Sequence, residues 1–406
     1  MSQRLIEELA FAQHGVVSNP VGNGSPQWYA LGLNSLALQS LVSLFDEKEK
    51  LFFQRITVTE NGLSRQGTSL RGTIIALLGV QRLAESGVAE PFDTASIREA
   101  VWRDSTWVRS IGDLGLLTWF TALCEPERLG VRLDAFNFGK ALESYPDGRH
   151  GSTTALAWFL TGIAHARLAC PGALPDLTDV AAETYHLLLE NQSESGIFGH
   201  AASPISLRKP FCKRFGTFAD QAHAIYALSI FARAFEIEEP LEPALNCAKA
   251  LCALQGEMGQ WWHLYDARTC RVVNQYPVFS CQQDGIAPAA LLALREATCQ
   301  SFDDSIYKGL SWIAGANELA IDLRDSGSSL IWDSIGPRRP LAKYWEAALS
   351  FMGFSRGLPP ELLKIRFEAR PEHFGWLLYA FGKFGVPAIS RAQPRDVDKG
   401  RPHQIV

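Results

Sequence analysis

The sequence predicts an all-helical protein built from repeated helical hairpins. The motif Gln192-Ser-Glu-Ser-Gly196-Ile-Phe198 recurs as Gln255-Gly-Glu-Met-Gly259-Gln-Trp261, at an offset of 255 − 192 = 63 residues. Each copy follows an apolar segment of helical length, residues 180–191 or 244–254, and leads into a polar loop and a second such segment. Glycine permits the positive φ that ends a helix, and the aromatic residue two positions later can fold back over the hairpin end. A period of this length is typical of a helical repeat and not of a doubly wound sheet.

The helical segment after each loop begins with an aspartate. Asp220 starts the run Asp-Gln-Ala-His-Ala-Ile-Tyr-Ala-Leu and Asp284 starts the run Asp-Gly-Ile-Ala-Pro-Ala-Ala-Leu-Leu, at an offset of 284 − 220 = 64 residues. Aspartate at a helix start accepts hydrogen bonds from free backbone N–H groups, and Pro288 would lie in the first turn, where it is tolerated. Both aspartates can therefore be explained as helix caps alone.

Weaker copies of the pattern extend the series in both directions. Further apolar runs of helical length follow polar loops and begin at Gly72, Asp113, Thr153, Tyr344 and His373. Signals for strands are scarce between them. We therefore predict six or seven helical hairpins in one domain over residues 1–388. The charged, proline-containing tail over residues 389–406 is expected to be disordered.

Composition narrows the classes of function. At 406 residues and 47% hydrophobic content, the chain has enough apolar material for one large core. The net charge of −5 is mild and no Lys/Arg run or basic helix is present, so we expect no nucleic-acid partner. No apolar run is long enough to span a membrane, and the acidic, amphipathic first segment does not resemble a signal peptide. We therefore expect a soluble, cytoplasmic protein.

The cysteines and the standard cofactor motifs bear on metals and cofactors. The eight cysteines include no Cys-x-x-Cys pair and are expected to be reduced and mostly buried. Cysteines and histidines around the two equivalent loops lack the short spacing of a structural zinc site. The sequence has no glycine-rich phosphate loop and no serine-nucleophile motif. We therefore expect neither a metal ion nor a cofactor.

Long loops inside the hairpins are the predicted location of a functional site. In a closed ring of hairpins these loops gather on one face, and long loops in a compact domain are usually functional. Three of them, residues 200–217, 263–283 and 327–343, carry basic side chains. We expect Arg208, Lys213 and Arg338 to bind an anionic substrate. The alternative is that these side chains only solvate exposed loops.

Aromatic and amide side chains accompany the basic ones in the second of these loops. Flat rings can stack on the apolar faces of sugars or line a cavity for an isoprenoid chain. We expect Trp261 to plug the hairpin end. The residues of this loop that are predicted to contact substrate are Trp262, His263, Tyr265, Tyr276, Gln282 and Gln283.

Carboxylates at the helix openings are the candidate catalytic groups. General acid–base catalysis needs two such groups in different environments. Asp284 is the foremost candidate, because the run Ser-Cys-Gln-Gln-Asp-Gly places it between aromatic loops just ahead of an apolar helix. Asp113 and Asp220 complete the set, although capping is the more economical explanation for both.

The motifs at Gln192 and Gln255, of the form Gln-x-x-x-Gly-x-Trp/Phe, resemble the repeat of the terpenoid cyclase and protein prenyltransferase superfamily, whose fold is an α/α toroid. Asp284-Gly-Ile-Ala stands where class II terpene cyclases carry Asp-x-Asp-Asp-Thr-Ala, and only one aspartate matches. The zinc-binding residues of the prenyltransferases are not recognisable. The resemblance implies a toroid and, as an alternative activity, an isoprenoid cyclase or prenyltransferase with Asp284 as the acid.

A second resemblance is to six-hairpin carbohydrate enzymes, which include unsaturated glucuronyl hydrolases and uronyl epimerases. Asp113-Leu-Gly-Leu-Leu is similar to the Asp-Leu-Gly-Phe sequence around a catalytic carboxylate in the glucuronyl hydrolases. The stretches Trp261-Trp-His-Leu-Tyr-Asp266 and Tyr276-Pro-Val look like sugar-binding segments. This resemblance implies an (α/α)6-type toroid of six or seven hairpins that acts on an anionic, uronic-acid-type glycan or oligosaccharide by hydrolysis, elimination or epimerisation. A non-catalytic glycan-binding or scaffold protein is the third hypothesis.

Overall fold

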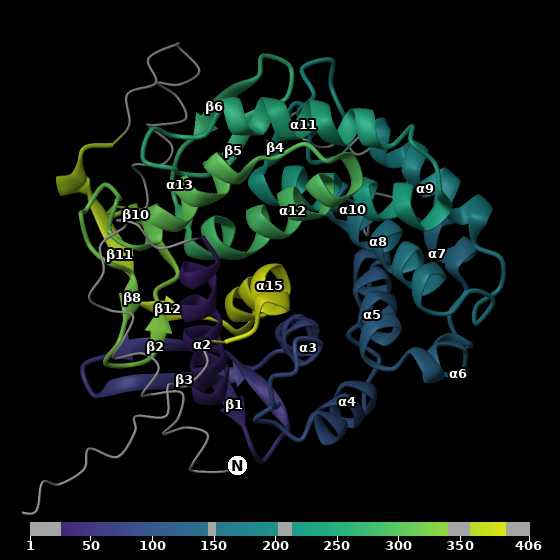
Figure 1. The fold of residues 1–406 in the computed structure, drawn as a ribbon, viewed down its shortest axis with the longest axis horizontal. Helices are drawn as coiled ribbons and strands as arrows, with labels where there is room; N and C mark the ends of the chain where they lie inside the picture. Colours follow the sequence, from purple (N-terminus) through teal and green to yellow (C-terminus); the bar gives the residue numbers. More distant parts are fainter. Residues whose placement is uncertain (1–25, 145–151, 202–212, 340–357, 387–406) are drawn as a thin grey trace, which may run out of the picture.

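The helices of the protein form a closed ring (Figure 1). The computed structural model describes residues 26–144, 152–201, 213–339 and 358–386. The inner helices of the ring are α3 (Leu70–Ala84), α5 (Ile111–Cys124), α8 (Thr153–Ala169), α10 (Phe218–Phe235), α12 (Ala287–Thr298) and α15 (Pro371–Phe381). Each packs against the next in chain order, and α15 packs against α3. The predicted all-α toroid is confirmed, with six hairpins in the described part of the chain.

Outer helices alternate with the inner ones along the chain. They are α2 (Pro26–Leu44), α4 (Thr94–Trp102), α6 (Leu129–Leu133), α7 (Phe138–Glu143), α9 (Thr178–Leu189), α11 (Leu241–Ala253) and α13 (Asp303–Ile313). In α13 the buried residues Ile306, Leu310 and Ile313 recur at helical spacing, so one apolar face covers the ring and the other face is solvated. The predicted N-terminal helix, the apolar run at Tyr344 and the predicted tail lie outside the described residues.

Glycines let two inner helices, α5 and α8, approach each other closely. A Cβ atom on Gly115 would lie 2.3 Å from the carbonyl oxygen of Trp158, and one on Gly162 would lie 2.3 Å from the carbonyl oxygen of Gly115. Both neighbours are backbone atoms that cannot move aside, so a larger residue would push the helices apart. This contact fixes the position of Trp158 relative to α5.

The repeated motif ends the outer helices α9 and α11 in the same way. The side-chain amide of the motif glutamine, Gln192 or Gln255, donates two hydrogen bonds of 2.9 Å. One goes to the carbonyl oxygen of the motif glycine and the other to the next outer helix. The motif glycines have φ values of +85° and +95°. Phe198 and Trp261 are fully buried, so the prediction that Trp261 plugs the hairpin end is confirmed.

The alignment of Asp220 with Asp284 is wrong. The residues that match in structure are Gln221 and Gln283, because each accepts a hydrogen bond from the backbone N–H of the motif aromatic residue, at 2.7 and 3.3 Å. Each also donates to the carbonyl oxygen four residues before it, at 3.1 and 3.3 Å. The offset of the inner helices is therefore 283 − 221 = 62 residues, which pairs Asp284 with Ala222.

A π-helical turn, η4 (Gln282–Ile286), leads into α12 and contains Asp284. Pro288 lies in the first turn of α12, as predicted. Asp284 thus lies inside a continuous helical stretch and not ahead of one. Turns of this kind are frequent at functional sites.

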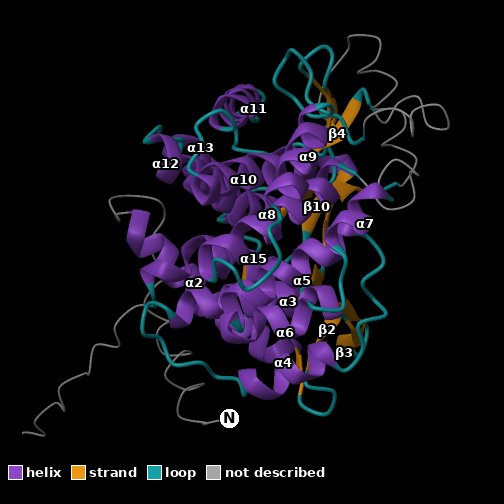
Figure 2. Cartoon of the chain, turned by 90° about the vertical axis from the view of Figure 1, so that its right-hand side faces the viewer, coloured by secondary structure: helices purple, strands orange, loops and turns teal. Residues whose placement is uncertain are grey.

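Short strands lie on the face where the inner helices begin (Figure 2). They pair antiparallel in four small sheets: β2 (Leu51–Thr59) with β1 (Phe45–Asp46), β3 (Gly62–Thr68) and β12 (Glu368–Ala369); β10 (Ser334–Pro337) with β7 (Val278–Phe279) and β11 (Leu363–Arg366); β5 (Leu264–Asp266) with β4 (Phe215–Thr217) and β6 (Arg271–Asn274); and β8 (Arg324–Asp325) with β9 (Leu330–Ile331). Because β3, β4 and β12 run directly into α3, α10 and α15, these sheets hold the starts of three inner helices in place.

Aromatic side chains fill the axis of the ring in layers. The sixth residues of α8, α10 and α15 are Trp158, His223 and Trp376. The ring of His223 lies 5.3 Å from that of Trp158 and 5.4 Å from that of Trp376. The ninth residues of α5, α10 and α15 are Trp119, Tyr226 and Tyr379, and the ring of Trp119 lies 5.2 to 5.5 Å from those of Tyr226, Tyr379 and Trp376.

Candidate active site

One end of the ring axis lies where the inner helices begin, and the aromatic layer nearest to it is formed by Trp158, His223 and Trp376. We call this layer the floor. Residues four apart on a helix share a face. Glu372 stands four residues before Trp376 and Thr154 four residues before Trp158, so both lie above the floor. Arg71, the second residue of α3, occupies the corresponding position on that helix. We call the region at Arg71, Thr154 and Glu372, one helical turn from this layer, the axial mouth.

The floor of the axial mouth combines flat rings with polar atoms. Trp158 is half-buried, and its Nε1 atom has no hydrogen-bond partner among the described residues. Burial lowers the pKa of His223 to about 4, against an opposing effect of Asp220, so this imidazole is neutral at physiological pH. A neutral imidazole between two indoles can stack on a sugar and exchange hydrogen bonds with its hydroxyl groups.

A buried Asp–His pair adjoins the axial mouth. Nε2 of His373 lies 2.8 and 2.9 Å from the two carboxylate oxygens of Asp284, and both side chains are buried. Burial raises the pKa of Asp284, and the charge and hydrogen bond of His373 oppose this rise. Because Nε2 faces the carboxylate, Nδ1 is the nitrogen left to accept a proton. Nδ1 makes no hydrogen bond within the described ranges of the chain. Asp284 therefore orients the imidazole, an arrangement that suits a general base.

Glu372 precedes this histidine in the first turn of α15. Burial raises its pKa, opposed by a backbone hydrogen bond and by the charge of Arg370. Its Oε2 atom is buried and has no hydrogen-bond partner in the part of the chain that the structure describes. A Cβ atom on Gly72 would lie 3.1 Å from Oε1 of Glu372, so the glycine makes room for this carboxyl group against α3. A carboxyl group in such a position tends to hold its proton and can act as an acid.

Charged pairs lie behind Glu372 and involve the small sheets. Glu368 accepts from Arg370 at 2.6 Å and lies 3.6 Å from Arg55. Asp333 lies 3.6 Å from Arg366. Burial raises the pKa of Asp333, and its hydrogen bond from Ser334 opposes that effect. Each of these arginines thus already has a carboxylate partner.

Asp113, a predicted catalytic residue, lies at the axial mouth but is fully engaged. Nε and Nη2 of Arg71 each lie 2.6 Å from its Oδ1. Its Oδ2 accepts from the backbone N–H of Arg109 at 3.1 Å and from the hydroxyl of Ser110 at 3.0 Å. Asp113 therefore ties the starts of α3 and α5 together, which is the capping role considered from the sequence.

Asp220, the other predicted member of the set, also ties two helices together. It forms a capping box with Thr217 at the start of α10. Its Oδ1 accepts from the hydroxyl of Thr154 at 2.8 Å, and its Oδ2 lies 3.1 Å from Nδ1 of His200. All of these contacts are structural, and they fix Thr154 beside the axial mouth.

The predicted aromatic contacts are packed into the protein. Tyr265 is fully buried in β5. The buried Tyr276 donates from its hydroxyl to Glu318 at 3.0 Å, and Trp262 packs edge-on against it at 6.0 Å. These rings hold the loop between α11 and η4 together and are not presented to solvent, because few other apolar groups are available to give that loop a core.

The polar residues predicted from the same loop have separate roles. Gln283 holds the backbone of Trp261, as described above. Gln282 is buried, and its Oε1 atom has no hydrogen-bond partner among the residues described. The half-buried His263 packs its ring against Phe279 at 6.0 Å. The structure does not gather these three side chains around one ligand position.

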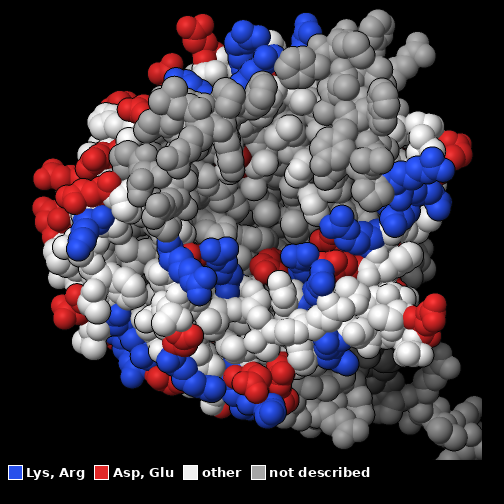
Figure 3. All heavy atoms as spheres, turned by 180° about the vertical axis from the view of Figure 1, so that it is seen from behind, with Lys and Arg blue, Asp and Glu red and all other residues white. Residues whose placement is uncertain are grey.

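Two of the three predicted basic residues belong to the described part of the chain. Lys213 is exposed just before β4, Arg338 is exposed just after β10, and Arg208 lies outside the described residues. On the face opposite that of Figure 1, basic and acidic side chains alternate across the part that is not grey (Figure 3). That part of the surface therefore carries both positive and negative charge.

Reasoning from the sequence missed Glu372, His373, Trp158 and Trp376 as a group. The run at His373 was used only to place a helix. A usable signal was present, because Glu372 and Trp376 stand at i and i+4 on a helix opening, as Thr154 and Trp158 do. Polar residues in the first turn of an inner helix, followed one turn later by an aromatic residue, mark the axial mouth.

Two features are absent from the described residues. None of the described helices is long and apolar enough to cross a membrane. Within the same residues, no three histidine, cysteine, aspartate or glutamate side chains lie together in a way that could hold a metal ion.

Comparisons with known proteins rest on structure. No protein-family model matches the chain, and no curated protein matches it in sequence. A possible member of the GH105 family from Klebsiella pneumoniae is 12% identical, with a TM-score of 0.58 over 90% of this chain and 95% of its own. Cellobiose 2-epimerase from Bacillus thermoamylovorans is 10% identical, with a TM-score of 0.57 over 94% and 100%. An unsaturated glucuronyl hydrolase specific for heparin is 11% identical, with a TM-score of 0.51 over 93% and 97%. The chain thus shares the α/α-toroid fold of six-hairpin carbohydrate enzymes along nearly its whole length.

Proposed function

We propose that this protein is a carbohydrate-active enzyme and that the axial mouth is its active site. The reaction that the geometry supports best is transfer of a proton at the sugar carbon next to a carbonyl group, as in epimerisation. The observation that carries the proposal is the buried His373–Asp284 pair, beside the carboxyl group of Glu372, whose Oε2 has no hydrogen-bond partner among the described residues, and beside an aromatic floor.

Each residue of the axial mouth has a separate role in this reaction. His373 accepts the proton at Nδ1, and Asp284 stabilises the imidazolium that forms. Glu372 holds a proton and donates it to the carbonyl oxygen, where negative charge develops. Glu372 and His373 are consecutive on α15, so their side chains leave the helix in directions about 100° apart. Glu372 lies toward α3 and His373 toward Asp284. Trp158 and Trp376 support the sugar ring from below.

Similarity to an epimerase supports this choice of reaction. The cellobiose 2-epimerase covers nearly the whole chain, and a sugar epimerase from a ruminal bacterium also has a TM-score of 0.57. The charged side chains near Glu372 also favour a neutral sugar as the substrate. The arginines there are each paired with a carboxylate of the protein, so they are not left to bind an anionic sugar. The carbohydrate reaction is preferred to the isoprenoid cyclase because the axis carries His165, His223 and tyrosine hydroxyls, whereas an isoprenoid chain requires an apolar cavity.

Action on an anionic, uronic-acid-type glycan is the second candidate. It is supported by the heparin-specific glucuronyl hydrolase among the similar structures and by Arg71 at the axial mouth. Arg71 is half-exposed and could turn to a substrate carboxylate at the expense of Asp113. This reaction would place a different demand on the site, because hydrolysis needs a second carboxyl group facing a water molecule.

Incubation of the full chain in D2O with reducing mono- and disaccharides tests the proposal. Proton exchange at the carbon next to the carbonyl group, followed by NMR, is the expected result, together with a new epimer. Unsaturated uronides are assayed in parallel by loss of their ultraviolet absorbance. Turnover of uronides without any exchange in reducing sugars would replace the first candidate by the second.

Three variants assign the exchange to the site. His373→Asn and Glu372→Gln are each expected to lower the rate about a hundredfold or more, as loss of an acid or base does. The matched control is Asp266→Asn, which removes another buried carboxylate, one that is paired with Arg214 in β5. Exchange that survives in both site variants would show that the axial mouth is not the active site.

A further inference from the structure

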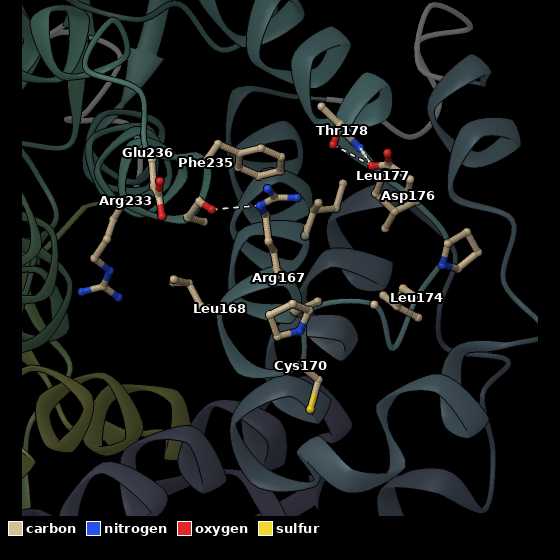
Figure 4. Close-up of a pocket in the computed structure, with 16 residues that line it drawn as sticks. Arg167, Leu168, Cys170, Leu174, Asp176, Leu177, Thr178, Arg233, Phe235 and Glu236 are labelled. Atoms are coloured by element: carbon tan, nitrogen blue, oxygen red, sulfur yellow. Dashed lines mark hydrogen bonds between the residues drawn. The ribbon is translucent and has the colours of Figure 1, made fainter.

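A pocket of about 500 Å³ lies where α8 and α10 end, on the face opposite the axial mouth. Figure 4 shows the residues that line it. It is formed by the ends of α8 and α10 and by the segment that joins α8 to α9, residues 170–178. Its volume is within the usual range for small-molecule sites. Because α8 and α10 begin at the axial mouth and end at this pocket, the two regions are separated by the length of these helices. It serves no part of the proposed reaction.

Arg167 is held in a fixed position within this pocket. Its Nε donates to the carbonyl oxygen of Ala234 at 3.0 Å, and its guanidinium carbon lies 4.5 Å from the ring centre of Phe235. Figure 4 shows the guanidinium beneath the Phe235 ring, with Asp176 and Thr178 to one side and Arg233 and Glu236 to the other. The hydrogen bond and the stacking contact leave Nη1 and Nη2 as the groups available to a ligand.

Asp176 and Arg233 have partners of their own in or near the lining. Hydrogen bonds from Thr178 lower the pKa of Asp176, and the charge of Arg167 lowers it further. Arg167 forms no ion pair with a carboxylate in the described part of the chain. Oδ1 of Asp176 accepts from the backbone N–H and the hydroxyl of Thr178, at 3.0 and 2.6 Å. Arg233 lies 3.8 Å from Glu296 outside the pocket. Glu236 ends α10 with a left-handed backbone conformation. In Figure 4 it lies on the same side of the Arg167 guanidinium as Arg233. Arg167 is therefore the group in this lining that is best placed to bind an anion.

The pocket wall around Arg167 contains several apolar side chains. They include Leu168, Leu174, Leu177, Pro171 and Pro175, and Leu168 is 40% exposed. An anion without an apolar part would leave these side chains in contact with water, whereas a ligand with a compact apolar body would cover them. A planar guanidinium pairs with two oxygens of one group, as in a carboxylate or a phosphate monoester.

From these contacts we infer that the pocket is a second binding site, which takes a small organic anion with a carboxylate or phosphate group and a compact apolar body. Arg167 binds the anionic group through Nη1 and Nη2. The leucines and prolines of the 168–177 segment enclose the apolar body. The competing explanation is that Arg167 only caps the last turn of α10 through the carbonyl oxygen of Ala234.

Binding of three matched probes to the full chain tests the inference. The probes are phenylacetate, phenyl phosphate and the neutral phenylacetamide, each titrated by calorimetry or by NMR. Saturable binding of at least one anionic probe, at least about tenfold tighter than that of the amide, is expected from a charge-assisted pair. Comparison of the two anions separates a carboxylate site from a phosphate site. Equal binding of the amide, or no saturable binding of either anion, would overturn the inference.

Two variants separate binding from capping. Arg167→Lys keeps the positive charge but loses the planar guanidinium group. We expect it to lower the affinity for the anionic probe about tenfold. Arg233→Gln removes a charge from the same lining that is already paired with Glu296, so its effect is expected to stay within about twofold. Circular dichroism checks that both variants are folded. Unchanged affinity in Arg167→Lys would leave capping as the role of this arginine. Since none of these measurements involves the axial mouth, the result is independent of the proposed reaction.

Discussion

The two copies of the repeat are alike where their hairpins end and different where the next inner helix begins. In both copies the motif glutamine makes the same two hydrogen bonds, the glycine has a positive φ and the aromatic side chain is buried. The inner helix of the first copy, α10, then opens with a regular capping box at Asp220. The inner helix of the second copy, α12, opens through the π-helical turn that carries Asp284.

This difference lies directly beside an anchor that both copies share. Gln221 and Gln283 keep the same structural role, so the two helices are anchored at equivalent points. The residue after the anchor is Ala222 in one copy and Asp284 in the other, and only the second lies within a π-helical turn. A carboxylate therefore replaces a small apolar residue, and it faces His373 on the neighbouring helix α15.

The largest expected effect comes from exchanging the two aspartates for asparagine. Asp284→Asn removes the charge that stabilises the His373 imidazolium, so we expect kcat for sugar exchange to fall about a hundredfold or more. Asp220→Asn breaks a capping box, so we expect a loss of about 0.5–2 kcal/mol in the free energy of unfolding and a rate within a fewfold of the native one. Kinetics and urea unfolding of both variants measure the two effects. Equal losses of rate would show that the two openings do not differ in function.

The sequence predicted the part of this comparison that depends on local chemistry. The glutamine, glycine and aromatic residue act within a few positions of one another, so their spacing was visible, and with it the hairpin repeat. The π-helical turn was not visible, because Asp220 and Asp284 fall at nearly the period of the motif and both precede apolar runs. The partner of Asp284 stands 89 residues further along the chain, and only closure of the ring brings the two together. The orphan Oε2 of Glu372 likewise depends on contacts between distant helices.

The motif glycines provide the next largest effect and test the shared frame. A Cβ atom on Gly259 would lie 2.1 Å from the carbonyl oxygen of Lys308, and one on Gly196 would lie 2.8 Å from that of Asn246. Both glycines also have a positive φ, which alanine adopts at a cost. We expect Gly259→Ala to cost about 3 kcal/mol or more and Gly196→Ala somewhat less. Denaturant unfolding measures both. A smaller loss for Gly259→Ala would contradict the closer packing of the second copy.

His223 sharpens the comparison through pH, because the equivalent position in the second copy, 223 + 62 = 285, is a glycine. Its folded pKa of about 4 lies below the ordinary value of 6.5, so the unfolded chain binds more protons between these values. The stability contributed by neutral His223 is fully present above pH 6.5 and is lost as the pH falls to 4. The gap of 6.5 − 4 = 2.5 in pKa corresponds to roughly 3 kcal/mol.

The variant His223→Gln is therefore expected to lose less stability on acidification than the native chain. Burial also lowers the pKa of His165, so part of the acid sensitivity will remain in the variant. Urea unfolding at pH 7, 5.5 and 4.5 gives the slope for both proteins. Parallel slopes would mean that His223 can be protonated in the folded state without cost, and that the floor of the axial mouth is more open to water than its burial indicates.

The smallest expected effect concerns the motif glutamines, where the two copies should respond alike. Gln192 and Gln255 each donate two hydrogen bonds of 2.9 Å, one within the hairpin end and one to the next outer helix. Replacement by alanine removes both hydrogen bonds, so we expect each variant to lose about 1–3 kcal/mol in the free energy of unfolding, with the two losses equal within about 0.5 kcal/mol. The double variant should show the sum, because the two hairpin ends share no hydrogen-bond partner. A much larger loss at Gln255 would mean that the π-helical turn at Asp284 depends on the hydrogen bonds of the second hairpin end.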